Sequence, residues 1–368
     1  MVKIKAANQA LLGPLQHVTG IVERRHTLPI LSNVLIHAHG GTVDFVATDL
    51  EVQITAKAVL EGDGAEGSVT VGARKLYDIL RSLPDDAEVA LDAKENRMVV
   101  RAGKSRFNLQ TLAAADFPRM VESRDATRTL SLPQKALKHA LGLVQFAMAV
   151  QDIRYYLNGV LFSVEKDMLR VVATDGHRLS FAAESLGSEH ESVEAILPRK
   201  TVLELIKLLA DSDDPVALAI GSNQVRFSFG GIEIVSKIVE GKFPDYQKVI
   251  PTTHRNKVAI GRAALAQSLN RAAILSNEKI RGVRLVFTKN ALSIICTNNE
   301  QEEAEEGLTI DYDGDPLDIG FNISYLLDVL NHVDAETVTV TMGDSNSSAL
   351  VQIPGNDDFK YVVMPMRI

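Results

Sequence analysis

The feature that most constrains this chain is a short pattern that occurs three times, about a third of the chain apart. In each copy an apolar run stops at a threonine followed by an aspartate or asparagine, at Thr48-Asp49, Thr174-Asp175 and Thr297-Asn298. An internal period of this kind has to be tested first, because it decides the architecture of the whole fold. The spacing here is the length of a domain, so the pattern favours one domain in three copies. Such a chain suits a scaffold or a ring better than a single catalytic cleft.

Two amphipathic helices recur at the same offset. The apolar residues of the first helix follow the spacing i, i+4, i+7 and i+11, which predicts one buried helical face. They are Leu11, Leu15, Val18 and Val22 in the first copy, Leu137, Leu141, Val144 and Met148 in the second, and Leu265, Leu269 and Ala272 in the third. The second helix has Leu76, Ile79, Leu80 and Leu83, then Val202, Leu205, Ile206 and Leu209, then Leu326, Val329, Leu330 and Val333.

Each second helix is followed by an alternating apolar run, at 88–91, 216–220 and 337–341, which is typical of a half-buried strand. The glycines at 40–41 and 62–64 predict hairpin or loop turns. Each copy therefore reads as helix, strands, helix, strands, which predicts an α+β fold with mostly antiparallel sheets. Short polar linkers near 123–129 and 252–256 place the predicted domains at 1–124, 129–253 and 254–368. The alternative, a chance likeness of three α+β domains, has to explain five elements that match in order.

Composition narrows the class of protein. The 368 residues are 46% hydrophobic and 23% charged, as in soluble globular proteins, and no run approaches a membrane span of about 20 apolar residues. The sequence begins without the apolar core of a secretory signal. One cysteine, Cys296, excludes internal disulfides and cysteine-cluster metal sites, which favours a cytoplasmic location; we interpret it as a small core residue. The net charge of −8 disfavours tight wrapping of nucleic acid but permits a local basic face.

Four stretches resemble one known family, the bacterial sliding clamps, which are the beta subunits of replicative DNA polymerases. The stretches are RYYLNG at 154–159, ATDGHRL at 173–179, ILSNEK at 274–279 and YVVMPMR at 361–367. The resemblance covers the whole chain, including the tripled domain. It implies the DNA clamp fold, with two helices packed on antiparallel sheets in each domain. It also implies a head-to-tail homodimer that closes a ring of six domains, with helices lining the hole.

The resemblance implies a non-catalytic role in DNA replication without a cofactor or metal. Duplex DNA would pass through the ring without sequence recognition, and the clamp would tether the replicative DNA polymerase and confer processivity. The clamp loader, repair polymerases, ligase and mismatch-repair proteins would bind through short linear motifs. The expected location is the cytoplasm, in association with the nucleoid.

A head-to-tail ring needs two different surfaces that fit each other. A basic run over 97–112 and an acidic run over 300–306 offer such a pair. The resemblance places the following residues across the interface: Lys104, Arg106, Phe107 and Leu109 on one side, and Ile274, Leu275, Glu300, Glu302, Glu303, Glu305 and Glu306 on the other. We expect the apolar residues to supply most of the affinity, because rim charge pairs contribute about 0–1 kcal/mol each. The charges would select the partner and register; the alternative is that both runs are solvated faces.

The residues that the resemblance places near DNA phosphates are Arg24, Gln151, Tyr155, Tyr156 and Lys200. Further positive potential is expected from Lys135, Lys138, Arg262 and Arg271 on the predicted first helices. Phosphate contacts carry no sequence information, and no recognition-helix or zinc-finger pattern occurs. We expect weak binding of DNA that falls with salt, because a clamp has to slide.

The last residues are unusually apolar, which predicts that they dock as an edge strand or form a pocket. The resemblance implies a groove for partner peptides built from Leu157, Thr174, Gly176, His177, Arg178, Leu179, Pro244, Val249, Asn322, Tyr325, Val362, Val363, Met364, Pro365, Met366 and Arg367. Methionines suit a site that accepts several peptides, because their side chains repack readily. This chain has Lys248 where we expect arginine in some relatives, which could shift motif preference, and Ile368 is a mild apolar variation.

Two alternatives remain open. One is a hydrolase that uses Asp175 and His177, but their spacing matches no known metal motif, and the other copies do not keep the histidine. There is also no phosphate-binding loop of the GxxxxGK type and no GxSxG elbow. The other alternative is a purely structural repeat scaffold, which predicts an open chain of subunits and is disfavoured by the opposed charged runs and the apolar last residues.

Overall fold

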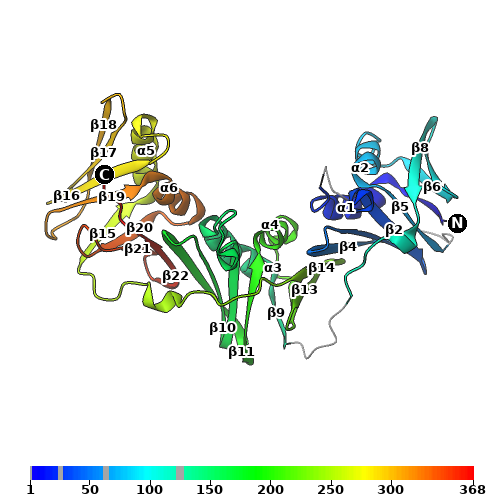
Figure 1. Cartoon of the computed structure of the whole chain (residues 1–368), viewed down its shortest axis with the longest axis horizontal. Coiled ribbons are helices and arrows are strands. Elements are labelled where there is room, and N and C mark those ends of the chain that lie inside the picture. The colour runs from blue at the N-terminus through cyan, green and yellow to red at the C-terminus, as the bar shows by residue number, and fades with distance from the viewer. Residues whose placement is uncertain (1, 24–27, 61–65, 122–127) are drawn as a thin grey trace. The chain divides into compact units, whose positions relative to one another are not determined.

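The computed structural model describes residues 2–23, 28–60, 66–121 and 128–368 (Figure 1). The helices in this part of the chain are α1 (Asn8–Thr19), α2 (Ala73–Arg81), α3 (Gln134–Val144), α4 (Arg199–Leu208), α5 (Arg262–Ala272) and α6 (Ile323–His332). None of the described helices is both long and apolar enough to cross a membrane. The chain divides into two compact units, one made of Met1–Lys135 with Leu203–Ile238 and the other of Ala136–Val202 with Val239–Ile368.

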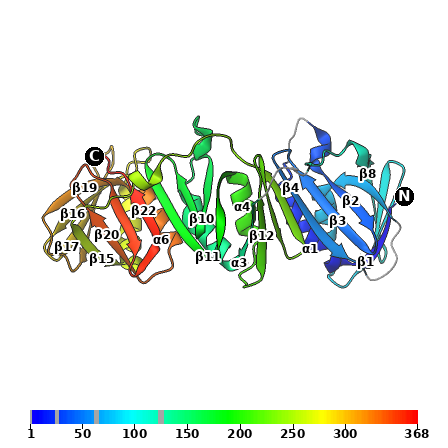
Figure 2. The ribbon, with the colours of Figure 1, turned by 90° about the horizontal axis from the view of Figure 1, so that it is seen from below.

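The first unit is built on one antiparallel sheet, which has twelve strands among the described residues in the order β1-β6-β7-β8-β5-β2-β3-β4-β14-β13-β12-β9. The strands are β1 (Val2–Ala7), β2 (Asn33–His39), β3 (Thr42–Thr48), β4 (Val52–Val59), β5 (Gly67–Gly72), β6 (Glu88–Lys94), β7 (Arg97–Ala102), β8 (Ser105–Leu112), β9 (Arg128–Pro133), β12 (Pro215–Ile220), β13 (Gln224–Phe229) and β14 (Ile232–Lys237). Figure 2 shows β2, β3 and β4 side by side. The register of β4 and β14 runs from Ala56↔Ile232 to Val52↔Ser236, so one sheet spans two copies of the repeat.

The second unit holds two antiparallel sheets among its described residues, ordered β10-β11-β22-β21-β20-β15 and β18-β17-β16-β19. The strands are β10 (Gly159–Thr174), β11 (Arg178–Pro198), β15 (Asn256–Gly261), β16 (Gly282–Thr288), β17 (Ala291–Thr297), β18 (Glu303–Thr309), β19 (Leu317–Asn322), β20 (Thr337–Met342), β21 (Ala349–Ile353) and β22 (Asn356–Val363). β11 pairs with β22 from Arg178↔Val363 to Ala182↔Phe359. The middle and last copies are therefore also joined by main-chain pairing.

The predicted helical faces are confirmed as buried. In α1 the side chains of Leu11, Leu15 and Val18 have no exposed surface, and Leu269 and Ala272 of α5 are equally enclosed. Burial of these apolar faces against the sheets stabilises helices that are too short to persist alone in water. The exceptions lie at the edges of the pattern. Leu83, Ile79 and Ile206 are only half-buried, and Val22, Leu83, Met148, Leu209 and Val333 follow the ends of their helices.

The predicted strands and one predicted turn are also confirmed. The alternating runs form β6, β12 and β20. Gly40 and Gly41 connect β2 to β3 with φ of +52° and +75°, as a two-residue hairpin requires. Residues 62–64 and most of the linker near 123–129 lie outside the described residues.

The repeated Thr-Asx pattern is a turn that closes itself. The hydroxyl of Thr48 donates to the carbonyl of Val52 at 2.9 Å, and that of Thr174 donates to the carbonyl of Arg178 at 2.6 Å. The next side chain accepts two backbone amides: Asp49 does so in the first copy, Asp175 in the second, and Asn298 in the third. Short polar side chains are used in this way wherever a chain reverses direction. The motif that reveals the repeat is therefore a structural device.

Candidate functional site

The turn between β10 and β11 has no carboxylate oxygen free for catalysis. Asp175 Oδ1 accepts the amides of His177 at 2.9 Å and Arg178 at 3.0 Å. Its Oδ2 accepts from the Arg178 guanidinium at 3.1 Å. A general base or a metal ligand needs an available lone pair, and these are taken. No group of three side chains in the described residues is placed to hold a metal ion. The turn is built to hold a shape.

Arg178 joins this turn to two other segments. One terminal nitrogen donates to Asp328 of α6 at 2.5 Å, and the other donates to the carbonyl of Phe146 at 2.6 Å. The guanidinium also lies over the Tyr325 ring, 4.3 Å from its centroid. Only 9% of the side chain is exposed. Arg178 therefore supports the predicted groove from behind, because all of its donor nitrogens face the protein.

The apolar last residues dock as the sequence predicts, as an edge strand that continues beyond β22. We call Val362–Ile368 the tail. Val362 and Val363 are buried within β22. The amide of Met364 donates to the carbonyl of His177 at 2.9 Å, and the amide of Met366 donates to the carbonyl of Gly320 at 2.8 Å. The tail thus bridges the 174–178 turn and strand β19, while 44% of Met364 stays exposed.

A buried apolar cluster lies beside the tail. Leu179 and Val362 pack in it together with Phe243 and Tyr246. The segment from Pro244 to Val249 passes along this cluster, and Val249 is 38% exposed. Solvent-accessible apolar groups at the edge of a buried cluster are typical of protein-binding surfaces.

The start of α6 completes this arrangement. The Asn322 side chain caps the helix by accepting the amide of Ser324 at 2.9 Å. The Tyr361 hydroxyl donates to the carbonyl of Tyr325 at 2.9 Å, and burial raises the pKa of Tyr361 above its ordinary range. We define the cleft as the 174–179 turn, the tail, the 244–249 segment and the residues Asn322 and Tyr325. The structure brings these predicted residues together in one unit of the chain.

Leu157 is held near the cleft by a loop that sequence reasoning did not explain. Leu157 is buried, and its amide donates to the carbonyl of Arg154 at 2.8 Å. Arg154 forms an ion pair with Asp152 at 2.9 Å, and these hydrogen bonds lower the pKa of Asp152 to about 2. The same guanidinium reaches the carbonyl of Asp175 at 3.4 Å. Arg154 was therefore missed as a residue that ties this loop to the turn, although it stands next to two predicted positions.

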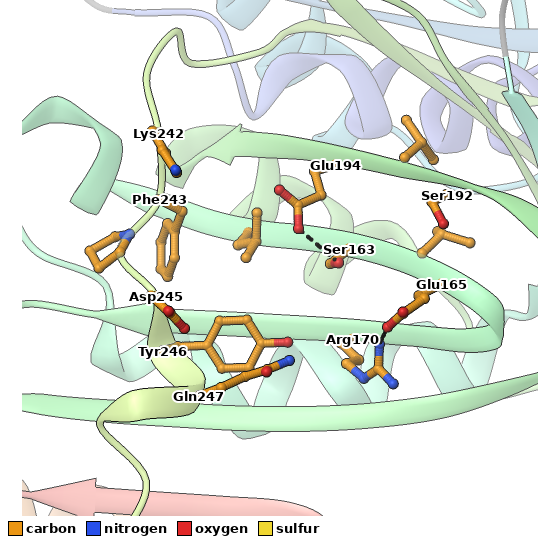
Figure 3. A pocket seen from close by; sticks show the side chains of 14 residues that line it. Ser163, Glu165, Arg170, Ser192, Glu194, Lys242, Phe243, Asp245, Tyr246 and Gln247 are labelled. Carbon is orange, nitrogen blue, oxygen red and sulfur yellow. Dashed lines mark hydrogen bonds and ion pairs between the residues drawn. The ribbon is translucent and has the colours of Figure 1, made fainter.

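A hollow of about 520 Å³ lies on the other side of the 242–247 segment (Figure 3). Its wall is formed by β10 and β11, where Ser163 donates to Glu194 at 3.1 Å and Arg170 pairs with Glu165 at 2.6 Å. Pro244 lines the hollow as well as the cleft. The sequence pattern did not reveal this hollow, because its lining comes from three separate stretches of chain.

The predicted DNA-facing residues differ in their exposure. Gln151 is exposed with φ of +56°, and 66% of Tyr155 is exposed. Tyr156 is half-buried against the apolar cluster of the cleft, and Lys200 is half-buried in the first turn of α4. Arg24 lies outside the described residues.

Most of the helix cations expected to add positive potential are occupied. Lys135 pairs with Asp213 at 2.8 Å, and Arg262 donates to the carbonyls of Ala335 and Leu330 at 2.7 and 3.0 Å. Arg271 of α5 pairs with Glu306 at 2.5 Å, and this hydrogen bond holds the pKa of Glu306 below its usual value. Of the four, only Lys138 has no ion pair or hydrogen bond recorded in the structure. The basic potential of these helices is therefore smaller than the sequence suggests.

Two strand edges carry the predicted interface residues. Residues 105–110 of β8 pair with β7 on one side, and no described strand pairs with their other side. β18 is the end strand of its sheet. Phe107 and Leu109 are half-buried on β8, while 77% of Ile274 is exposed near β18. Ile274 and Leu275 line a hollow of about 450 Å³ together with Glu300 and Glu302.

Along β18 the glutamates alternate in direction. Glu303 and Glu305 are exposed, whereas Glu306 is half-buried and bound to Arg271 of the same chain. Glu306 is therefore engaged within its own chain, unlike Glu303 and Glu305. The sequence showed an acidic run, but the strand geometry divides it into two faces.

Comparison with known proteins gives matches along the whole chain. Residues 2–121, 131–245 and 247–367 match the N-terminal, central and C-terminal domain families of the DNA polymerase III beta subunit. The "Beta sliding clamp" of Pseudomonas putida is 48% identical over 361 residues, which cover 98% of each chain. The "Beta sliding clamp" of Escherichia coli is 45% identical over 366 residues and all of each chain.

Solved structures agree. A DnaN sliding clamp from Pseudomonas aeruginosa bound to griselimycin superposes with a TM-score of 0.96 and 46% identity over the full length of both chains. The Caulobacter crescentus beta sliding clamp, with polyethylene glycol in a putative motif-tethering region, gives 0.92 and 37% identity over 100% of this chain and 99% of that one.

Proposed function

The chain belongs to the family of DNA polymerase III beta subunits, the bacterial sliding clamps, and on that premise we propose which surfaces hold its partners. It is a non-catalytic subunit that acts in DNA replication with DNA and polymerase and confers processivity. Three domains with antiparallel sheets and two helices each make up its clamp fold. We propose domain limits of 1–124, 129–253 and 254–368, which are supported by the three separate family matches.

We propose that the cleft binds short linear motifs of partner proteins. The observation that carries this proposal is the tail, because its amides are fixed to the 174–178 turn and to β19 while Met364 remains exposed. A peptide with apolar side chains would bury them against Leu179, Val362 and Val249. The occupants would be the replicative polymerase, the clamp loader, repair polymerases, ligase and mismatch-repair proteins in turn. Thioether side chains repack at low cost, so one cleft can serve several motifs.

The test is fluorescence anisotropy of a labelled peptide that carries a glutamine followed by a Leu-Phe pair. We expect micromolar binding to the full chain and none to a version that ends at Val363, because the shortened chain lacks the exposed part of the tail. A scrambled peptide is the control for non-specific binding. Sedimentation of both versions checks that the truncation leaves folding and assembly unchanged. Equal binding to both versions would refute the tail as a wall of the cleft.

We propose that duplex DNA passes along a surface that includes Gln151, Tyr155, Tyr156, Lys200 and Arg24. The exposure of Gln151 and Tyr155 supports this assignment. Contacts would be made to phosphates and would not select a sequence. The location that suits these partners is the cytoplasm, in association with the nucleoid.

We propose that two copies close a ring through a third joint of the same kind as the two within the chain. In each joint, a strand that follows a Thr-Asx turn (β4 or β11) pairs with the last strand of the next copy's sheet (β14 or β22). The strand after the third turn is β18, and the corresponding strand of the first copy is β8. Both have an open edge in the described structure. Pairing of β18 with the β8 of a second molecule would use both edges and give a head-to-tail dimer.

Apolar side chains next to these edges would supply the affinity of the joint. Phe107 and Leu109 on β8 face the same side of the strand, and Ile274 and Leu275 line the hollow beside β18. Sedimentation of an Ile274→Ala, Leu275→Ala variant should show monomers at concentrations where the unaltered chain is dimeric. The matched control is Val59→Ala, which truncates a side chain that is 73% exposed on another strand. A variant that stays dimeric would refute this contact.

A further inference from the structure

Two glycines on neighbouring strands form a notch on the outer face of the four-stranded sheet. Gly282 lies on β16 and Gly320 on β19, and the register pairs Gly282 with Asn322 and Arg284 with Gly320. These four residues therefore share one face, since side chains alternate along a strand. The opposite face carries Val283 and Phe321, which are buried. We call Gly282 and Gly320 the glycine notch.

The side chain of Ile368 occupies this notch. A Cβ at Gly320 would lie 2.8 Å from Cδ1 of Ile368 and would collide with the carbonyl oxygen of Met366. A Cβ at Gly282 would lie 3.2 Å from the same Cδ1, and the other two atoms nearest to it also belong to Ile368. Neither glycine has a positive φ, so the backbone does not require glycine at these positions. The close approach of the tail does.

The notch lies at a free edge of the sheet. β19 is an end strand, and its edge receives the tail through the bond from the Met366 amide to the Gly320 carbonyl. A single backbone bond at a sheet edge holds a segment weakly, because such a bond contributes only about 1 kcal/mol net. A branched apolar side chain seated on two glycines adds contact area just beyond that bond. Asn322, a residue of the cleft, lies on the same face.

We propose that Ile368 is a positioning residue of the peptide cleft, and that the glycine notch is its receptor. Seated there, Ile368 fixes the tail along β19, so that Met364 and Met366 are presented to the apolar side chains of a partner peptide. The proposal rests on the proposed function of the cleft. It also explains why the tail ends on an apolar residue when its neighbour Arg367 is exposed.

The test is a double-mutant cycle on peptide binding with Gly282→Ala, Ile368→Ala and the two together. Gly282→Ala inserts a methyl group that meets only the tail, so it should weaken binding about three- to tenfold. Ile368→Ala should weaken binding to a similar degree, because the anchor is lost. Adding Gly282→Ala to Ile368→Ala should then change nothing, because the atoms that the methyl group displaces are absent. Gly142→Ala in α3 is the control, since a Cβ there meets no atom within 4 Å.

Hydrogen exchange of the Met366 amide gives a second readout that needs no peptide. Exchange should be faster in Gly282→Ala and in Ile368→Ala, and unchanged in Gly142→Ala. If the unaltered chain bound no peptide, the proposed function would fail, and the exchange result would still decide whether the notch holds the tail. Unchanged exchange in Gly282→Ala, or an equal loss of affinity from Gly282→Ala with and without Ile368, would overturn the proposal.

Discussion

At the scale of single residues, polar side chains near the cleft are committed to structure. Asp175 closes a turn, Arg178 connects that turn to α6, and Asn322 caps a helix. The Asp-Gly-His-Arg stretch resembles a reactive cluster when only the order of residues is known. In space, the hydrogen bonds of Asp175 and Arg178 are already satisfied. The recognition chemistry is left to apolar side chains and backbone groups around them.

Arg178 should be replaceable by neither alanine nor lysine. Arg178→Lys keeps the charge but cannot reach Asp175, Asp328 and the Phe146 carbonyl together, because an ammonium group lacks the planar fork. We expect at least about a tenfold loss of peptide affinity from either substitution. Anisotropy measures the affinity, and thermal unfolding reports stability alongside it. Arg170→Lys is the matched control, because its pair with Glu165 lies on the hollow beside the cleft. Full affinity in Arg178→Lys would show that the fork is not needed.

Cys296 should react slowly with thiol reagents. It is 1% exposed, and burial raises its pKa from 9.0 to about 11. The thiolate population in the folded chain at pH 8 is therefore about a hundredfold smaller than in the unfolded chain. Because the folded pKa is the higher one, the neutral thiol stabilises the fold below pH 9, and this contribution is lost as the pH rises towards about 11. A chromogenic disulfide should label the unfolded chain in urea much faster than the folded chain, and equal rates would contradict the assignment.

At the scale of elements, the joints between repeats consist of paired strands. β4 pairs with β14, and β11 pairs with β22, in each case over five residues. The edges of β8 and β18 have the same form but no partner within the described chain. Their charges differ in sign: β8 carries Arg106, and β18 carries exposed Glu303 and Glu305. Like edges would repel each other, which favours pairing of β8 with β18.

Two adjacent glutamates of β18 should respond differently to neutralisation. Glu305 is exposed, so Glu305→Gln should weaken the dimer at low salt and have little effect at high salt. Glu306 is bound to Arg271 of its own chain, so Glu306→Gln should leave the dimer unchanged. Sedimentation at two salt concentrations measures both effects. Equal weakening by the two substitutions would show that strand direction does not separate their roles.

Acid should release the Arg271–Glu306 pair late. The pKa of Glu306 is lowered in the folded chain, so its contribution to stability is present above the ordinary value of 4.5 and is lost as the pH falls through the lowered folded value. Carboxyl resonances followed by NMR should place the midpoint of Glu306 below 4.5, and Arg271→Gln should return it towards that value. A midpoint of 4.5 or above in the unaltered chain would contradict the ion pair.

At the scale of the whole molecule, a net charge of −8 makes DNA affinity depend on a few local groups. Several cations on the predicted first helices are already neutralised by neighbouring carboxylates. Weak contacts suit a protein that must stay on DNA without stopping on it. Retention would then come from closure of the ring around the duplex.

Direct DNA binding should be weak and should fall steeply with salt. Each phosphate contact that is lost lowers the salt slope by about one unit, so a clamp with few contacts should show a shallow slope. Tyr155→Ala should reduce binding to linear duplex at low salt and leave peptide binding unchanged, because its exposed ring is outside the cleft. Ile153→Ala on the same loop is the control for loop distortion. Submicromolar affinity for linear duplex at physiological salt would contradict the sliding role.

Much of the fold could be predicted from the sequence, because helix and strand periods depend on local apolar spacing. The buried faces of α1 and α5, and the strands β6, β12 and β20, follow directly from that spacing. The fused strands β10 and β11, of 16 and 21 residues, could not be read from spacing, because bulges within them shift the register. The contacts of Arg178 with Asp328 and of Ile368 with Gly282 join residues far apart in the chain. No local pattern carries that information.

The two joints within the chain also have a consequence for its history. Hydrogen bonds between backbones carry no requirement for particular side chains, so the strands at a joint can change composition while the joint persists. Gene copies that once encoded identical domains could therefore drift until little more than Thr-Asx turns and helical spacing marked their common origin. Among single substitutions, only proline removes a donor from such a joint. The order of elements should consequently outlast sequence likeness between the three domains by a wide margin.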